Sequence, residues 1–90
     1  MATPFDLDKD AANIAKHGVS LSLAFDMDFD VAIVREDTRA AYGEQRFQAI
    51  GPIGGTLFVL AFTYRNEEMR PISLRRAEKA EGRKFRKELE

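Results

Sequence analysis

The stretch TLFVLAFTY, residues 56–64, decides how the rest of the chain is arranged. Its apolar residues occupy both alternating sets of positions, which is typical of a central strand with both faces covered. Directly before it, the four residues Pro52 to Gly55 predict the loop of a hairpin to an earlier strand. We therefore expect this stretch to lie in the middle of a small sheet.

The segments on either side predict the remaining strands. Together with the central one, they are expected at about Asp30–Arg35, Arg46–Gly51, Thr56–Arg65 and Met69–Leu74. Pro71 cannot donate a hydrogen bond to a strand ladder, so the last strand should lie at an edge or contain a bulge. In a regular strand Arg70, Ile72 and Leu74 would project from one face.

Helices are expected before and after the strands. The first ends near Lys16, with Asp6 or Asp8 as its N-cap, Gly18 as its C-cap, and one stripe formed by Leu7, Ala11, Ile14 and His17. Ser20 caps a second, short helix, whose buried face is expected to be Leu21, Ala24 and Phe25. The charged stretch 75–90 predicts a loosely held C-terminal helix that includes Arg76, is weakened by Gly82, and can pack only through Leu74, Ala77, Phe85 and Leu89.

The order of these elements predicts one α+β domain over residues 1–90. It has two N-terminal helices, a small, mainly antiparallel sheet of about four strands, and a C-terminal helix. The chain has no cysteine, which excludes disulfides and thiolate metal sites. The acidic N-terminus does not resemble a signal peptide, and the longest apolar run is too short to cross a membrane. We expect a soluble, cytoplasmic protein.

Charge is distributed unevenly along the chain. Residues 1–64 carry five Lys/Arg and nine Asp/Glu, whereas residues 65–90 carry nine Lys/Arg and six Asp/Glu, so the formal charges are −4 and +3. A basic C-terminal part suits contact with a polyanion at one end of the molecule. A charged, solvated helix would produce the same count, so this interpretation stays open.

The acidic run FDMDFD, residues 25–30, partly matches a calcium-binding loop. Asp26, Asp28, Asp30 and Asp37 fall on the first, third, fifth and twelfth positions of an EF-hand. The sixth position, which requires glycine, is Val31, and the following residues predict a strand. We interpret the acids as turn residues and expect neither a metal nor another cofactor.

One group of polar residues fits phosphate chemistry. If the strand from Arg46 runs antiparallel to the central strand, Glu44 and Arg46 lie near Thr63 and Arg65. Cleavage of RNA by its own 2′-hydroxyl requires a base, an acid and fixed positive charge, and arginine supplies the charge well. The alternative is a Glu-Arg pair on a sheet edge without chemical function.

The chain resembles the BrnT ribonuclease toxins of bacterial type II toxin-antitoxin systems. The resemblance runs from Phe5 to the last helix and depends on FDLD, N-x-x-K-H-G-V-S (residues 13–20), Y-G-E-x-R-F (42–47), A-x-G with a following turn (49–55), F-T-x-R (62–65) and R-x-I-S-x-R-R-A (70–77). Pro71 and Leu74 depart from the family's usual aliphatic residue and alanine. The resemblance implies a RelE-like fold, RNA cleavage and inhibition of translation.

The resemblance also implies a partner, a DNA-binding BrnA-type antitoxin, so that contact with DNA is indirect and the complex can contain two toxin copies. On the strength of this resemblance and of the residue types, we assign catalysis to Glu44, Arg65, Arg70, Arg75 and His17. We assign RNA binding to Arg46, Thr63, Arg76 and Lys79. The alternative for His17 is a structural role at a helix C-terminus, where Asn13, one turn earlier, can orient it. The alternative function is a RelE-like module that binds RNA or a protein and cleaves nothing.

Overall fold

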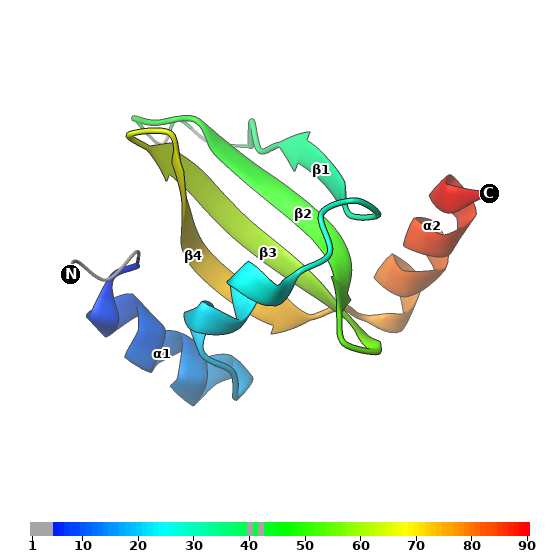
Figure 1. The fold of residues 1–90 in the computed structure, drawn as a ribbon, viewed down its shortest axis with the longest axis horizontal. Coiled ribbons are helices and arrows are strands. Elements are labelled where there is room, and N and C mark those ends of the chain that lie inside the picture. Colours follow the sequence, from blue (N-terminus) through cyan, green and yellow to red (C-terminus); the bar gives the residue numbers. More distant parts are fainter. Residues whose placement is uncertain (1–4, 40, 42) are drawn as a thin grey trace.

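The computed structural model describes residues 5–39, 41 and 43–90. The helices and strands follow the order α1 (Leu7–His17), η1 (Leu21–Asp26), β1 (Ile33–Glu36), β2 (Arg46–Ile53), β3 (Thr56–Arg65), β4 (Glu68–Arg76) and α2 (Lys79–Leu89). The four strands form one antiparallel sheet in chain order, β1-β2-β3-β4. Figure 1 shows α1 and η1 next to each other and α2 apart from them. The expected α+β class is confirmed.

A tight hairpin joins the two central strands, β2 and β3. Gly54 and Gly55 connect β2 to β3, and Gly54 has the positive φ of 62° that such a turn requires. Pro52 and Ile53 were expected in this loop, but this is wrong, because they pair with β3 as the last residues of β2. In a hairpin with a two-residue loop, the residues that flank the loop, here Ile53 and Thr56, form a hydrogen-bonded pair. The backbone nitrogen of the preceding residue, Pro52, therefore faces the β1 side of β2. Pairing with β1 ends at Ile50, so the missing N–H of Pro52 removes no hydrogen bond from the sheet.

A bulge in β4 changes which residues share a face. The register shifts between Ala61 and Phe62, which pair with Ser73 and Pro71 and leave Ile72 as an extra residue. The expectation of an edge or a bulge at Pro71 is confirmed, because β4 is both an edge strand and bulged there.

The bulge also overturns the expected common face of Arg70, Ile72 and Leu74. Arg70 pairs with Thr63 and Leu74 with Leu60, three residues apart on β3, so the two lie on opposite faces.

The end of β4 lies further along the chain than expected. Arg76 was assigned to the C-terminal helix, which is wrong: it is the last residue of β4 and pairs with Phe58. The strand continues because Leu74 is fully buried in the core and the Ala77 N–H donates to the Leu57 carbonyl at 2.9 Å. The helix α2 begins only at Lys79.

The main core lies between η1 and one face of the sheet. It includes Leu21, Ala24 and Met27 from the η1 region and Leu60 and Leu74 from the sheet. Phe25 was expected in this core but is 45% exposed. The reason is that η1 is a 3₁₀ helix with three residues per turn, so buried positions recur at 21, 24 and 27.

The helix caps are confirmed, but the apolar stripe of α1 is not its buried face. Asp6 accepts hydrogen bonds as N-cap, Gly18 is a left-handed C-cap, and Ser20 caps η1. The stripe residues Leu7 and Ile14 are 66% and 47% exposed. The buried residue of α1 is the polar Asn13.

The helix α2 covers the other face of the sheet. Phe85 lies with Ile50 and Val59 around one hollow, and these two strand residues alternate with the core residues Ala49 and Leu60. Gly82 is buried, and a Cβ atom there would lie 3.6 Å from the Leu57 side chain, an ordinary van der Waals distance, so α2 packs closely against β3 at this point. None of the helices in the described part of the chain is long and apolar enough to span a membrane.

Candidate active site

Three residues on neighbouring strands form a row across the sheet, called here the central row: Arg46, Thr63 and Arg70. Thr63 on β3 pairs directly with Arg46 on β2 and with Arg70 on β4. Residues that pair directly in an antiparallel sheet project from the same face. Since Thr63 follows the core residue Phe62, the central row lies on the face opposite the core, which α2 partly covers.

Glu44 reaches the central row from the loop before β2. Its carboxylate oxygens lie 3.6 Å from the Arg46 guanidinium and 3.8 Å from the Arg65 guanidinium. The expected meeting of the start of β2 with the end of β3 is therefore confirmed. Both distances are longer than a hydrogen bond, so charge attraction holds Glu44 between two cations while its oxygens can still accept a proton.

Thr63 has a different environment from the one expected of an RNA contact. It is only 2% exposed, and its hydroxyl donates to the Gln45 carbonyl at 2.6 Å. This bond ties β3 to the residue directly after Glu44, so Thr63 helps to position the catalytic candidate. Contact between Thr63 and RNA stays a prediction.

Arg70 keeps its guanidinium available for a ligand. It is half-buried and, within the described residues, forms no ion pair at 4.0 Å or less. The pKa of the Asp6 carboxyl is lowered mainly by hydrogen bonds from the backbone N–H groups of Lys9 and Asp8, and to a lesser degree by the charge of Arg70. Arg70 is therefore the member of the central row that lies nearest to the start of α1.

Arg75 is engaged by α2. Its two terminal nitrogens donate to the two carboxylate oxygens of Glu81 at 2.8 and 2.9 Å. The hydrogen bond raises the pKa of Arg75, and the same bond is the main cause that lowers the pKa of Glu81 from 4.5 to about 2. A phosphate could bind Arg75 only in competition with Glu81, and its catalytic role stays a prediction.

Arg76 and Lys79 lie at the other end of the sheet from Glu44. They line a shallow hollow of about 520 Å³ beside the β2-β3 turn, together with Gly55, Thr56, Leu57, Ala77, Glu78, Gly82, Arg83 and Arg86. The Arg76 guanidinium also lies over the Phe58 ring, 5.7 Å from its centroid. Four cations against one acid give this lining a charge of +3.

His17 is remote from the central row. It is the last residue of α1, one turn beyond Asn13, and α1 packs against the Leu74 part of β4. Asn13 does not orient it, because its described hydrogen bonds go to backbone groups of Val19 and Leu74. The structure therefore does not bring His17 to Glu44. The assigned catalytic role of His17 is not tested by this geometry, and its position at the end of α1 favours the structural alternative.

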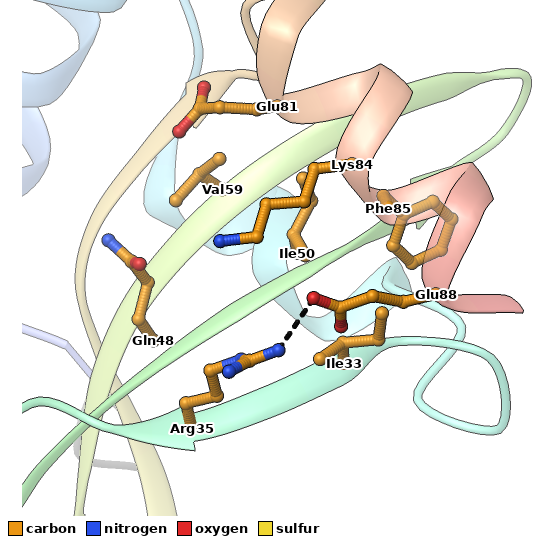
Figure 2. Close-up of a pocket in the computed structure, with 9 residues that line it drawn as sticks. All are labelled: Ile33, Arg35, Gln48, Ile50, Val59, Glu81, Lys84, Phe85 and Glu88. Atoms are coloured by element: carbon orange, nitrogen blue, oxygen red, sulfur yellow. Dashed lines mark hydrogen bonds and ion pairs between the residues drawn. The ribbon is translucent and has the colours of Figure 1, made fainter.

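A second hollow, of about 210 Å³, lies on the face of the central row, under α2 (Figure 2). Its lining residues are Ile33, Arg35, Gln48, Ile50, Val59, Glu81, Lys84, Phe85 and Glu88. The sequence interpretation missed all of them as site residues. One signal could have indicated Gln48: it lies two residues after Arg46 on the same strand, so both side chains project from one face of the sheet. Nothing in the sequence, however, places α2 over this face.

The comparisons with known proteins agree with the resemblance that the sequence motifs indicated. The family described as the ribonuclease toxin BrnT of type II toxin-antitoxin systems matches residues 5–81, whereas the curated proteins include no significant match. The matched range contains Glu44 and the central row and ends in the first turn of α2; its landmark Tyr42 lies outside the described residues. Since most of the chain is matched, it belongs to the BrnT family of ribonuclease toxins of type II toxin-antitoxin systems.

Proposed function

We propose that the chain cleaves RNA without a metal ion, with the ribose 2′-hydroxyl as the nucleophile. Glu44 takes the proton of the 2′-hydroxyl, the 2′ oxygen bonds to the adjacent phosphorus, and the bond from phosphorus to the 5′ oxygen breaks. Water protonates the departing 5′ oxygen. The products are a 2′,3′-cyclic phosphate and a 5′-hydroxyl.

The observation that carries this proposal is the position of Glu44 between Arg46 and Arg65, 3.6 and 3.8 Å away. A base must lie where the substrate phosphate also binds, and these two cations together with Arg70 supply that positive charge. Arginine matches two phosphate oxygens at once. Fixed positive charge stabilises the developing negative charge of the transition state, a task that a metal ion performs in other nucleases.

The proposed antitoxin is of the BrnA type. Cleavage of RNA in the cytoplasm inhibits translation until this antitoxin binds the toxin. A ribonuclease toxin of a type II system has a cognate antitoxin and an RNA substrate. We infer that the antitoxin covers the basic surface that contains Arg70, Arg75, Arg76 and Lys79, so that it blocks RNA by occupying the same positive charge. RNA should then compete with the antitoxin for the free chain.

The experiment that tests cleavage uses the purified chain, a structured RNA and excess EDTA. Cleavage should continue and leave 2′,3′-cyclic phosphate ends. Glu44→Gln keeps the size of the side chain and removes its basic oxygen, so the rate should fall by about 10²-fold or more while RNA binding is retained. Glu36→Gln, an exposed carboxylate on β1, is the matched control and should cleave normally. Activity that needs magnesium would refute the metal-free mechanism.

A second candidate function, binding of RNA or protein without cleavage, also has support from the structure. Thr63 is buried and Arg75 is occupied by Glu81, which leaves fewer side chains free for chemistry. This module should bind RNA with the same affinity before and after Glu44→Gln and should release no cyclic phosphate. Cleavage by the unchanged chain, abolished by Glu44→Gln, would exclude it.

A further inference from the structure

The hollow under α2 begins next to the central row. Gln48 follows Arg46 by two residues on β2, so the two side chains project from the same face about 7 Å apart. A phosphate held by the central row would therefore place the adjacent nucleotide at the entrance of this hollow. At about 210 Å³ it is smaller than the roughly 300–1,000 Å³ of sites for drug-sized ligands, which suits one ring system.

Two ion pairs hold the walls of the hollow in place. Arg35 on β1 donates to Glu88 near the end of α2 at 2.7 Å, a contact marked by the dashed line in Figure 2. Arg75 on β4 pairs with Glu81 in the first turn of α2. Between them Phe85 is buried against the sheet. Because both ends of α2 are tied to different strands, the hollow exists before any ligand binds.

The lining combines an apolar floor with two available polar groups. Ile50 and Val59 form part of the lining on the sheet. Among the described residues, Gln48 and Lys84 have no hydrogen bond or ion pair through their side chains. Figure 2 shows Lys84 extending from α2 across the space toward Gln48, so both can reach the edge of one ligand ring.

We propose that this hollow binds the base of the nucleotide next to the scissile phosphate, and that Gln48 and Lys84 select a purine. An unstacked base offers an apolar ring face and a polar edge, which match the aliphatic floor and the polar rim. A glutamine amide pairs with N6 and N7 of adenine, and a lysine donates to O6 and N7 of guanine. The cleavage role of this site rests on the proposed function.

The first test maps cleavage sites in a randomised RNA pool. The unchanged chain should cut beside purines at one fixed position. Gln48→Leu with Lys84→Met should lower kcat/KM for the preferred sequence by about 5- to 150-fold, as expected for loss of base contacts, and should leave other sequences unchanged. Lys87→Met, an exposed lysine on α2 that does not line the hollow, is the matched control. An unchanged preference in the double variant would overturn the proposal, as would the absence of any preference.

The second test separates this site from the cleavage mechanism. Uncharged nucleosides are titrated into the chain and followed by NMR, so that the arginines of the central row have no phosphate to bind. Adenosine or guanosine should shift the Gln48 side-chain amide and the Val59 methyl signals, and the double variant should remove the shifts. If purines bind but RNA is not cut, the base site stands and the catalytic proposal fails. If cytidine and uridine shift these signals equally, or no nucleoside does, purine selection is wrong.

Discussion

Replacement of Asn13 by alanine should destabilise the fold without touching the candidate active site. The Asn13 side chain is 4% exposed and donates to the carbonyls of Val19 and Leu74 at 2.9 and 2.8 Å. Its own oxygen accepts from the Leu74 N–H at 3.0 Å. Since β4 is an edge strand, the backbone N–H and carbonyl of Leu74 have no further strand to pair with. The Asn13 amide bonds both groups, as the backbone of a fifth strand would, at a point where they are buried.

The size of the effect follows from these bonds. Asn13→Ala leaves the Leu74 N–H and carbonyl without this partner in a buried place, and each such group costs about 1–3 kcal/mol. We expect a total loss of about 3 kcal/mol in the free energy of unfolding. For a domain of this size, that corresponds to a fall in Tm of about 12–24 °C.

Urea unfolding followed by circular dichroism measures this loss. Lys16→Ala, an exposed change on the same helix, is the control and should stay within about 0.5 kcal/mol of the unchanged chain. Asn13→Asp can still accept from Leu74 but cannot donate when ionised, so it should be destabilised at neutral pH and recover as acid protonates it. A loss below about 1 kcal/mol for Asn13→Ala would refute the edge-pairing argument, and lost cleavage at unchanged stability would make Asn13 a functional residue.

Three further outcomes are expected. The pKa of Glu81 is lowered to about 2 by Arg75, so this pair contributes stability above pH 4.5 that is lost as the pH falls through about 2; Glu81→Gln should remove that dependence in acid unfolding curves. His17→Gln should fold and cleave RNA at a normal rate, since His17 lies one turn beyond Asn13 and away from Glu44; loss of cleavage in a folded variant would contradict this. Arg83 and Arg86 line the basic hollow. If RNA binds there, Arg83→Gln and Arg86→Gln each remove one phosphate contact and should each reduce the slope of log affinity for single-stranded RNA against log salt concentration by about 0.7. An unchanged slope would place the RNA elsewhere.

The presence and order of the four strands could be predicted because their signals are local, although the expected ends of β1, β2 and β4 were wrong. The two-sided apolar pattern of residues 56–64 gave the central strand with its observed ends, and the glycine pair gave the turn before it. The meeting of Glu44 with Arg65 followed from that one hairpin, since antiparallel pairing places the start of one strand beside the end of the next. The caps at Asp6, Gly18 and Ser20 were also local signals.

The features that could not be predicted depend on contacts between residues that are distant in the sequence. The buried role of Asn13 depends on Leu74, 61 residues away. The position of α2 involves the packing of Phe85 over β2 and β3 and a contact between Arg35 and Glu88, which the sequence separates by 53 residues. Charged residues on a helix predict a solvated surface unless their partners are known, so the hollow beside Gln48 could not be located before the fold.

The bulge in β4 could have been inferred from a conflict in the sequence itself. Arg70 and Leu74 are four residues apart, so a regular strand would project both from one face, either burying the arginine or exposing the leucine. One inserted residue resolves this, because it changes the parity between them and leaves Leu74 in the core and Arg70 opposite Thr63. Pro71 fits the same place, since a bulge on an edge strand tolerates a missing N–H. The proposed phosphate contact of Arg70 therefore depends on a backbone irregularity, and a change that straightened β4 would remove it from the central row without altering the arginine.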